Sequence, residues 1–114
     1  MRPILAMLCL LSSPAFAQQV ATADQIKAAL TGNTVIGSMS ASGAYTEYYA
    51  ADGTIRAADY AGKWAIEGDK MCFTYGDDPA TCWAASVQGD QVTWLVDGVP
   101  EGTGTIQPGN PNGW

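Results

Sequence analysis

Short runs of β-forming residues separated by turn residues fill the chain from Asn33 onward, and this punctuation constrains the fold more than any other feature. Two of the turns are Gly-Asp pairs, at 68–69 and 89–90, and two are Asp-Gly pairs, at 52–53 and 97–98. Such pairs close tight β-hairpins because glycine, and to a lesser degree aspartate, adopts the positive φ angles that these turns need. The pattern predicts an all-β domain, an antiparallel meander of about six to eight strands curled toward a small barrel.

The two Gly-Asp turns fix the register of the central strands if each forms a two-residue loop. The turn at 68–69 then predicts these opposed pairs: Glu67 with Lys70, Ile66 with Met71, Ala65 with Cys72, and Trp64 with Phe73. The turn at 89–90 predicts these: Val87 with Val92, Ala85 with Trp94, and Trp83 with Val96. Each hairpin gains one apolar face, so its aromatic side chains are predicted to fill the core and to leave little room for a ligand cavity.

Two cysteines in neighbouring predicted strands favour a disulfide. Placing Cys72 opposite Cys82 also sets Met71 against Trp83 on the apolar face, so the registers of both hairpins agree. Counting from the two loops makes the cysteines a non-hydrogen-bonded pair, in which Cα atoms lie close enough for a disulfide. Nine residues separate them, unlike the two of a redox-active Cys-x-x-Cys motif. We therefore expect a structural disulfide, which forms in an oxidising compartment.

Residues 1–17 have the three parts of a cleavable signal peptide. Arg2 supplies a positive charge, Ile4 to Leu11 form an apolar run, and Ala15-Phe16-Ala17 fits the small-x-small cleavage pattern. The apolar run is much shorter than the roughly 20 residues that span a bilayer. We expect the mature protein to begin at Gln18 in the periplasm, without membrane insertion after cleavage. Loss of the signal leaves four basic and 11 acidic side chains, a net charge that disfavours nucleic-acid binding.

The mature chain is predicted to form a single β domain at 18–107. Thr22 is a typical helix N-cap and Gln25 stands at the third helical position, so together they indicate a capping box. The predicted helix covers about 23–31 and is too short to be stable unless it packs against the sheet. Residues 108–114 have the proline, glycine and asparagine content of a flexible C-terminal tail.

The Asp-Gly pair at 52–53 predicts a further hairpin, with Ala50 opposite Ile55 and Tyr48 opposite Ala57. The other face of this hairpin carries Tyr45, Glu47, Tyr49, Arg56 and Tyr60. Both faces hold aromatic rings, so alternation alone leaves the buried face open. We place the tyrosines outward, because small alanines on the first face suit close packing. The candidate interaction surface then consists of Tyr45, Tyr49, Arg56 and Tyr60. An equally weighted alternative is that these rings form cross-strand aromatic pairs that stabilise the sheet and bind no partner.

Composition and motifs argue against catalysis. The chain has no histidine, so the familiar histidine-activated nucleophiles and histidine metal sites are excluded. Asp77 and Asp78 stand between Gly76 and Pro79, a context typical of turn formation rather than of calcium binding. Gly102-Thr103-Gly104 lacks the strand-to-helix context and the lysine of a phosphate-binding loop. We expect no enzymatic activity, no cofactor and no metal site.

A set of motifs spans most of the mature chain: Tyr45 to Tyr49, Asp52-Gly53-Thr54, Gly62-x-Trp64, and the pair of Cys72 and Cys82. In this arrangement the chain resembles a family of small, uncharacterised secreted β-rich proteins of Gram-negative bacteria. The resemblance rests on turn and core residues and implies no activity. Gly62-x-Trp64 is also similar to the Gly-x-Trp motif that opens lipocalin barrels, although this chain is shorter than a usual lipocalin.

These observations predict a periplasmic, non-enzymatic binding or interaction protein whose partner is an unknown periplasmic protein or a small ligand. The first alternative is a lipocalin-like carrier of a small apolar ligand, and the second is a hydrolase whose site is not identified. A carrier requires a void that the tryptophans do not fill, whereas an interaction module requires an exposed apolar surface.

Overall fold

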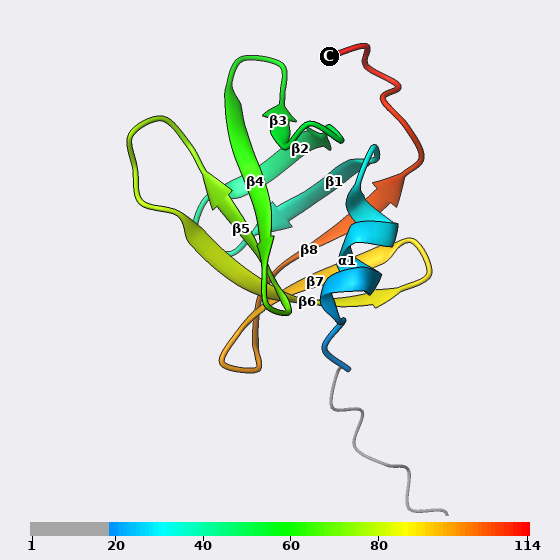
Figure 1. Cartoon of the computed structure of the whole chain (residues 1–114), viewed down its shortest axis with the longest axis vertical. Helices are drawn as coiled ribbons and strands as arrows, with labels where there is room; N and C mark the ends of the chain where they lie inside the picture. The colour runs from blue at the N-terminus through cyan, green and yellow to red at the C-terminus, as the bar shows by residue number, and fades with distance from the viewer. Residues whose placement is uncertain (1–18) are drawn as a thin grey trace, which may run out of the picture.

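The computed structural model describes residues 19–114, so the predicted signal peptide and Gln18 lie outside the described residues. Within 19–114, one helix precedes eight strands that pair in chain order and close into a barrel (Figure 1). The elements are α1 (Ala23–Leu30), β1 (Thr34–Met39), β2 (Gly43–Tyr49), β3 (Thr54–Arg56), β4 (Ala61–Glu67), β5 (Lys70–Thr74), β6 (Thr81–Gln88), β7 (Gln91–Val96) and β8 (Val99–Gln107).

The barrel closes where β8 pairs antiparallel with β1. The pairing runs from Thr34 opposite Gln107 to Met39 opposite Gly102. The other seven strand pairs are also antiparallel, so the predicted all-β meander is confirmed, and it is fully closed. Closure pairs strands that would otherwise be edges and gives the domain an inner and an outer face.

Both predicted Gly-Asp hairpins are present. Trp64 lies opposite Phe73 in the first, and Ala85 lies opposite Trp94 in the second. Gly68 and Gly89 have φ angles of 56° and 60°, which fit the first position of a tight hairpin turn. The predicted pair of Trp83 with Val96 is not part of the ladder, which ends one pair earlier in the same register, at Ala84 opposite Leu95.

The helix α1 lies at one end of the barrel, beside the hairpin turns of β4–β5 and β6–β7 (Figure 1). Thr22 and Gln25 form the predicted capping box, and Ile26 and Leu30 are completely buried. The backbone N–H of Ala23 donates to Asp69 Oδ1 at 2.9 Å, which ties the start of the helix to the β4–β5 turn. In the part of the chain that the structure describes, no helix has the length and apolar character needed to cross a membrane.

The segment after β8 follows the outside of the barrel and contacts β1 and β3. Thr34 Oγ1 donates to the carbonyl of Gly109 at 2.8 Å, and the N–H of Gly109 donates to Asn33 Oδ1 at 3.0 Å. Arg56 Nη1 donates to the carbonyl of Trp114 at 3.3 Å. These hydrogen bonds connect residues 109 and 114 to the barrel. The flexibility of the tail at 108–114 stays a prediction.

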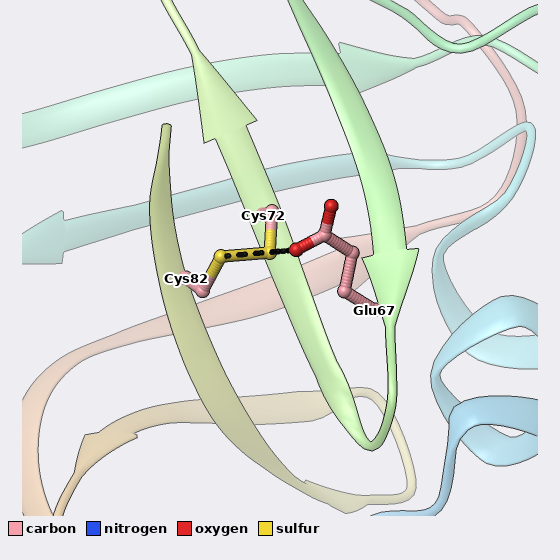
Figure 2. The surroundings of a disulfide bond; sticks show 3 residues. All are labelled: Glu67, Cys72 and Cys82. Carbon is pink, nitrogen blue, oxygen red and sulfur yellow. Dashed lines mark hydrogen bonds between the residues drawn. A yellow bond between two sulfur atoms is a disulfide. The ribbon is translucent and has the colours of Figure 1, made fainter. Parts of the chain in front are cut away.

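The predicted disulfide joins β5 and β6 on the outer face of the barrel (Figure 2). Cys72 and Cys82 are directly opposite each other, with their Cα atoms 3.9 Å apart. Glu67 Oε2 lies 3.5 Å from Cys72 Sγ, so these three residues bring potential metal ligands together. Metals bind the thiolate form of cysteine, and both sulfur atoms are used in the disulfide. The group is therefore structural in the oxidised protein.

Candidate functional site

A cavity of about 650 Å³ opens at the end of the barrel opposite α1. Its rim includes Ala41, Tyr60 and Gly76, from the β1–β2, β3–β4 and β5–β6 connections. Its aromatic walls, besides Tyr49, consist of Tyr45, Tyr60, Phe73, Tyr75, Trp83 and Trp94. An eight-stranded barrel can hold one small ligand, and ligand sites usually have volumes of roughly 300–1,000 Å³. The prediction that the core leaves little room for a cavity is wrong.

Not every large side chain of the barrel lines this space. Trp64 does not line it, and its Nε1 donates to the carbonyl of Ala50 at 3.0 Å. At the open end, Gly37 faces Gly104 across β1 and β8. A Cβ atom on either glycine would lie within 2.8 Å of the Tyr45 hydroxyl, so the two glycines let Tyr45 lie against the wall.

Edge-on aromatic contacts form the floor of the cavity. The rings of Phe73 and Trp94 lie 5.3 Å apart, and those of Tyr49 and Phe73 lie 5.9 Å apart, both edge-to-face. All three side chains are buried. Trp94 Nε1 donates to the Tyr45 hydroxyl at 2.9 Å, and that hydroxyl donates to the carbonyl of Thr103 at 3.2 Å. The polar atoms of this buried aromatic group are therefore hydrogen-bonded.

A buried carboxylate lies among the tyrosines. Glu47 is only 5% exposed and lines the cavity. Tyr49 donates to its Oε1 at 2.9 Å, Tyr60 donates to its Oε2 at 2.7 Å, and Tyr75 reaches both oxygens at 3.0 and 2.8 Å. We call these four residues the Glu47–tyrosine cluster. Its hydroxyl donors replace the water that a carboxylate loses on burial.

Strand alternation explains how the cluster assembles. Successive side chains of β2 point to opposite faces, so Tyr45, Glu47 and Tyr49 all point inward. Tyr60 comes from the β3–β4 connection and Tyr75 directly follows β5, both at the rim of the cavity. Their rings meet edge-to-face at 5.9 Å. Thus three separate segments supply the donors for one carboxylate.

Burial keeps the tyrosines protonated. It raises the pKa of Tyr45 to about 12, and the nearby charge of Glu47 adds to that increase while a hydrogen bond from Trp94 opposes it. The pKa values of Tyr49 and Tyr75 also lie well above the usual value, first because of burial and then because of the Glu47 charge. For Tyr60, burial and the hydrogen bond to Glu47 raise the pKa. All four hydroxyls therefore remain neutral hydrogen-bond donors at neutral pH.

The outward placement of the tyrosines is wrong. Tyr49 is 1% exposed, and Tyr45 points into the cavity, whereas Tyr60 is 42% exposed at the rim. Arg56 is on the outer face, where it forms an ion pair with Asp52 at 3.5 Å. The four residues of the candidate interaction surface therefore do not form one exposed surface.

The cause is a register error of one residue in the hairpin at 52–53. The structure pairs Tyr49 with Ile55, not Ala50 with Ile55 as predicted, because the connection is longer than a two-residue loop. The carboxylate of Asp52 accepts hydrogen bonds from both the backbone N–H and the hydroxyl of Thr54, at 3.0 and 2.7 Å. Side-chain hydrogen bonds of this kind stabilise the longer turn. Since a one-residue shift reverses which face meets the core, Tyr49 and Ile55 are buried together.

Sequence reasoning missed the roles of Tyr75 and Glu47. The sequence places Glu47 on the same face as the tyrosines, but does not by itself predict that this face is buried. The available signal is a carboxylate that alternates with two tyrosines, Tyr45 and Tyr49, in one strand. On a buried face such a residue requires hydrogen-bond donors, and tyrosines are suitable ones. Asp77 and Asp78 are exposed in the β5–β6 connection, and neither lines the cavity.

Raising the pH above about 10 should destabilise the fold. Tyrosines ionise near pH 10 in an unfolded chain, but Tyr45 keeps its proton in the folded protein until about pH 12. Stability is therefore complete below pH 10 and falls as the pH rises through this window, because only the unfolded state releases the protons. A completely buried group such as Tyr49 contributes about 1.4 kcal/mol of loss per pH unit.

Absorbance at 295 nm and far-UV circular dichroism, followed together against pH, measure this effect. We expect most tyrosinate absorbance to appear as the β-sheet signal is lost, and Tyr45→Phe to make the pH dependence less steep. Ionisation of all five tyrosines near pH 10 with an intact β-sheet signal would contradict the assignment.

Comparison with known proteins identifies no relative of this chain. No protein-family model matches the chain, and neither the curated proteins nor the solved structures contain a match to it. The resemblance to small secreted proteins of Gram-negative bacteria therefore stays a prediction. The closed barrel and its open, aromatic cavity are the observations from which function has to be argued.

Proposed function

We propose that this protein binds a small, largely apolar organic molecule inside the barrel, as a carrier or binding protein of the periplasm. The observation that carries the proposal is the open cavity of about 650 Å³. Small-molecule sites are concave and mostly apolar, with a few polar groups that orient the ligand. Here aromatic side chains form the walls, and Glu47 and Tyr60 are among the polar groups.

The cavity supports this function better than it supports a protein-interaction surface on the tyrosine hairpin. Tyr45 and Tyr49 point into the barrel, so their rings are not available to a protein partner. Tyr45 is only partly buried and lines the cavity, so its ring is available to a molecule small enough to enter the open end, while Tyr49 is buried beneath it. The alternative function from sequence, a small-ligand carrier, therefore becomes the first choice.

N-phenyl-1-naphthylamine, a neutral aromatic probe that fluoresces in apolar surroundings, provides a direct test. We expect saturable binding, with energy transfer from Trp83 and Trp94 because both line the cavity. Thr81 is exposed at the mouth of the cavity. Thr81→Trp should block the mouth and weaken binding at least about tenfold, a change of about 1.4 kcal/mol.

The matched control is Thr103→Trp, because Thr103 is also exposed on a strand but does not line the cavity. This control should bind the probe as the unmodified protein does. Absence of saturable binding, or equal binding by the two variants, would count against a ligand site in the barrel.

A further inference from the structure

We propose that the ligand is an organic cation, with an amine or quaternary ammonium group that lies near Glu47 and an apolar body that fills the cavity. This inference rests on the proposed function, because it names the class of molecule that the cavity binds. It follows from the charges, the aromatic rings and the hydroxyl oxygens that surround the cavity.

The charged groups of the cavity all have the same sign. Among the described residues, Glu47 and Glu101 line it, and no lysine or arginine does. The ion pair of Arg56 with Asp52 lies on the outer face and leaves Glu47 without a cationic partner among its hydrogen-bonding groups. A carboxylate in a region of low dielectric constant attracts a cation more strongly than it would in water. A ligand with a positive charge supplies the missing counter-charge, whereas fatty acids and phosphates are repelled.

The aromatic walls add a second source of selectivity for cations. Trp83, Tyr60 and Tyr75 lie around the entrance side of the cavity, and Tyr60 and Tyr75 also belong to the Glu47–tyrosine cluster. The face of an aromatic ring carries partial negative charge and attracts an ammonium group within about 6 Å. Tyr60 and Tyr75 therefore place two rings beside the carboxylate of Glu47, and Trp83 adds a third ring to the same cavity, which together give the chemistry of an aromatic cage.

The hydroxyl oxygens of Tyr60 and Tyr75 can accept hydrogen bonds from a ligand. Tyr60 and Tyr75 donate their protons to Glu47, so the lone pairs of their oxygens remain free to accept a hydrogen bond from a ligand N–H. The negative charge of Glu47 polarises both hydroxyls and makes their oxygens better acceptors. A bound cation would thus meet the neutral tyrosine hydroxyls first, and the negative charge of Glu47 would lie directly beyond them.

The test compares a cation with a neutral molecule of the same shape, and both with an anion. Benzyltrimethylammonium and neopentylbenzene have the same shape, with nitrogen in the first replaced by carbon in the second, and 4-phenylbutyrate serves as the anion. Displacement of N-phenyl-1-naphthylamine from the unmodified protein measures all three. We expect the cation to bind at least about tenfold more tightly than its neutral counterpart, and the anion to bind most weakly.

The variant Glu47→Gln keeps the size of the side chain and removes its charge. It should weaken binding of the cation at least about tenfold and change binding of neopentylbenzene less than threefold. Glu67→Gln is the matched control, because it removes the same charge from the outer face beside the disulfide and should change neither affinity. Near-UV circular dichroism checks that the Glu47 variant is folded.

The outcomes separate this inference from the function on which it rests. Equal or tighter binding of neopentylbenzene to the unmodified protein would overturn the cation inference and leave the ligand-binding function intact. So would binding of the probe without any displacement by benzyltrimethylammonium. Failure of the probe itself to bind would remove the proposed function. If Glu47→Gln does not fold, the comparison of the three ligands on the unmodified protein still decides the question.

Discussion

Replacing Tyr49 with alanine is expected to lower the free energy of unfolding by about 3–5 kcal/mol, the usual cost of removing a large aromatic side chain from a core. Tyr49 is 1% exposed and contacts Phe73 edge-to-face. Its hydroxyl also donates to Glu47 at 2.9 Å, so the alanine variant deprives a buried carboxylate of one donor as well. Urea denaturation followed by tryptophan fluorescence measures the loss.

Two control variants separate the contributions of the ring and the hydroxyl. Tyr49→Phe keeps the ring and should cost about 1–3 kcal/mol, the cost of a lost hydrogen bond to a charged group. Tyr48→Ala removes the neighbouring tyrosine, which is less buried, and should cost about 1 kcal/mol. A loss for Tyr49→Ala no larger than that for Tyr48→Ala would mean that the ring is at the surface, as the sequence alone led us to expect.

The Tyr49 error shows where sequence reasoning on this fold stops. At 68–69 and 89–90, a Gly-Asp pair lies between two alternating apolar runs. The turn and the apolar face indicate the same register there, so pairs such as Trp64 with Phe73 and Ala85 with Trp94 were predicted correctly. At 52–53 both faces carry aromatic side chains, so the turn alone had to set the register. The Asp52 carboxylate accepts hydrogen bonds from Thr54 in a turn longer than two residues, so the register differs by one residue and the core meets the face that we predicted to be exposed.

The candidate site depends on long-range contacts and on the cavity volume, which a local sequence pattern does not predict. Two of the three tyrosines that donate to Glu47, Tyr60 and Tyr75, lie 13 and 28 residues further along the chain and come together only in the folded barrel. Closure itself joins residues near the two ends of the domain, such as Thr34 and Gln107. The volume of the cavity depends on where each large side chain points, and Trp64, which donates to the carbonyl of Ala50, does not line it. The capping box of that helix, in contrast, involves residues three positions apart and was predicted correctly.

Removing the disulfide should cost about 2–5 kcal/mol, as is usual for a native cross-link in a small domain. The cross-link spans β5 and β6, which pair through only three positions in the structure: Met71 with Trp83, Cys72 with Cys82, and Phe73 with Thr81. Because these neighbours also supply Phe73, Thr81 and Trp83 to the cavity wall, we expect the Cys72→Ser, Cys82→Ser variant to lose affinity for the neutral probe as well as stability. Urea denaturation and probe titration measure the two effects.

The state of the cysteines in the unmodified protein is checked by intact mass. Protein purified from the periplasm should have the mass of residues 18–114 less two hydrogen atoms, and should regain those two hydrogens on reduction. Since neither cysteine lines the cavity, we expect reduction to change ligand binding only by loosening the β5–β6 pairing. Free reaction of both thiols with an alkylating reagent in the native, unreduced protein would refute the cross-link. A serine variant that is as stable as the unmodified protein would show that the remaining pairs hold β5 and β6 together without it.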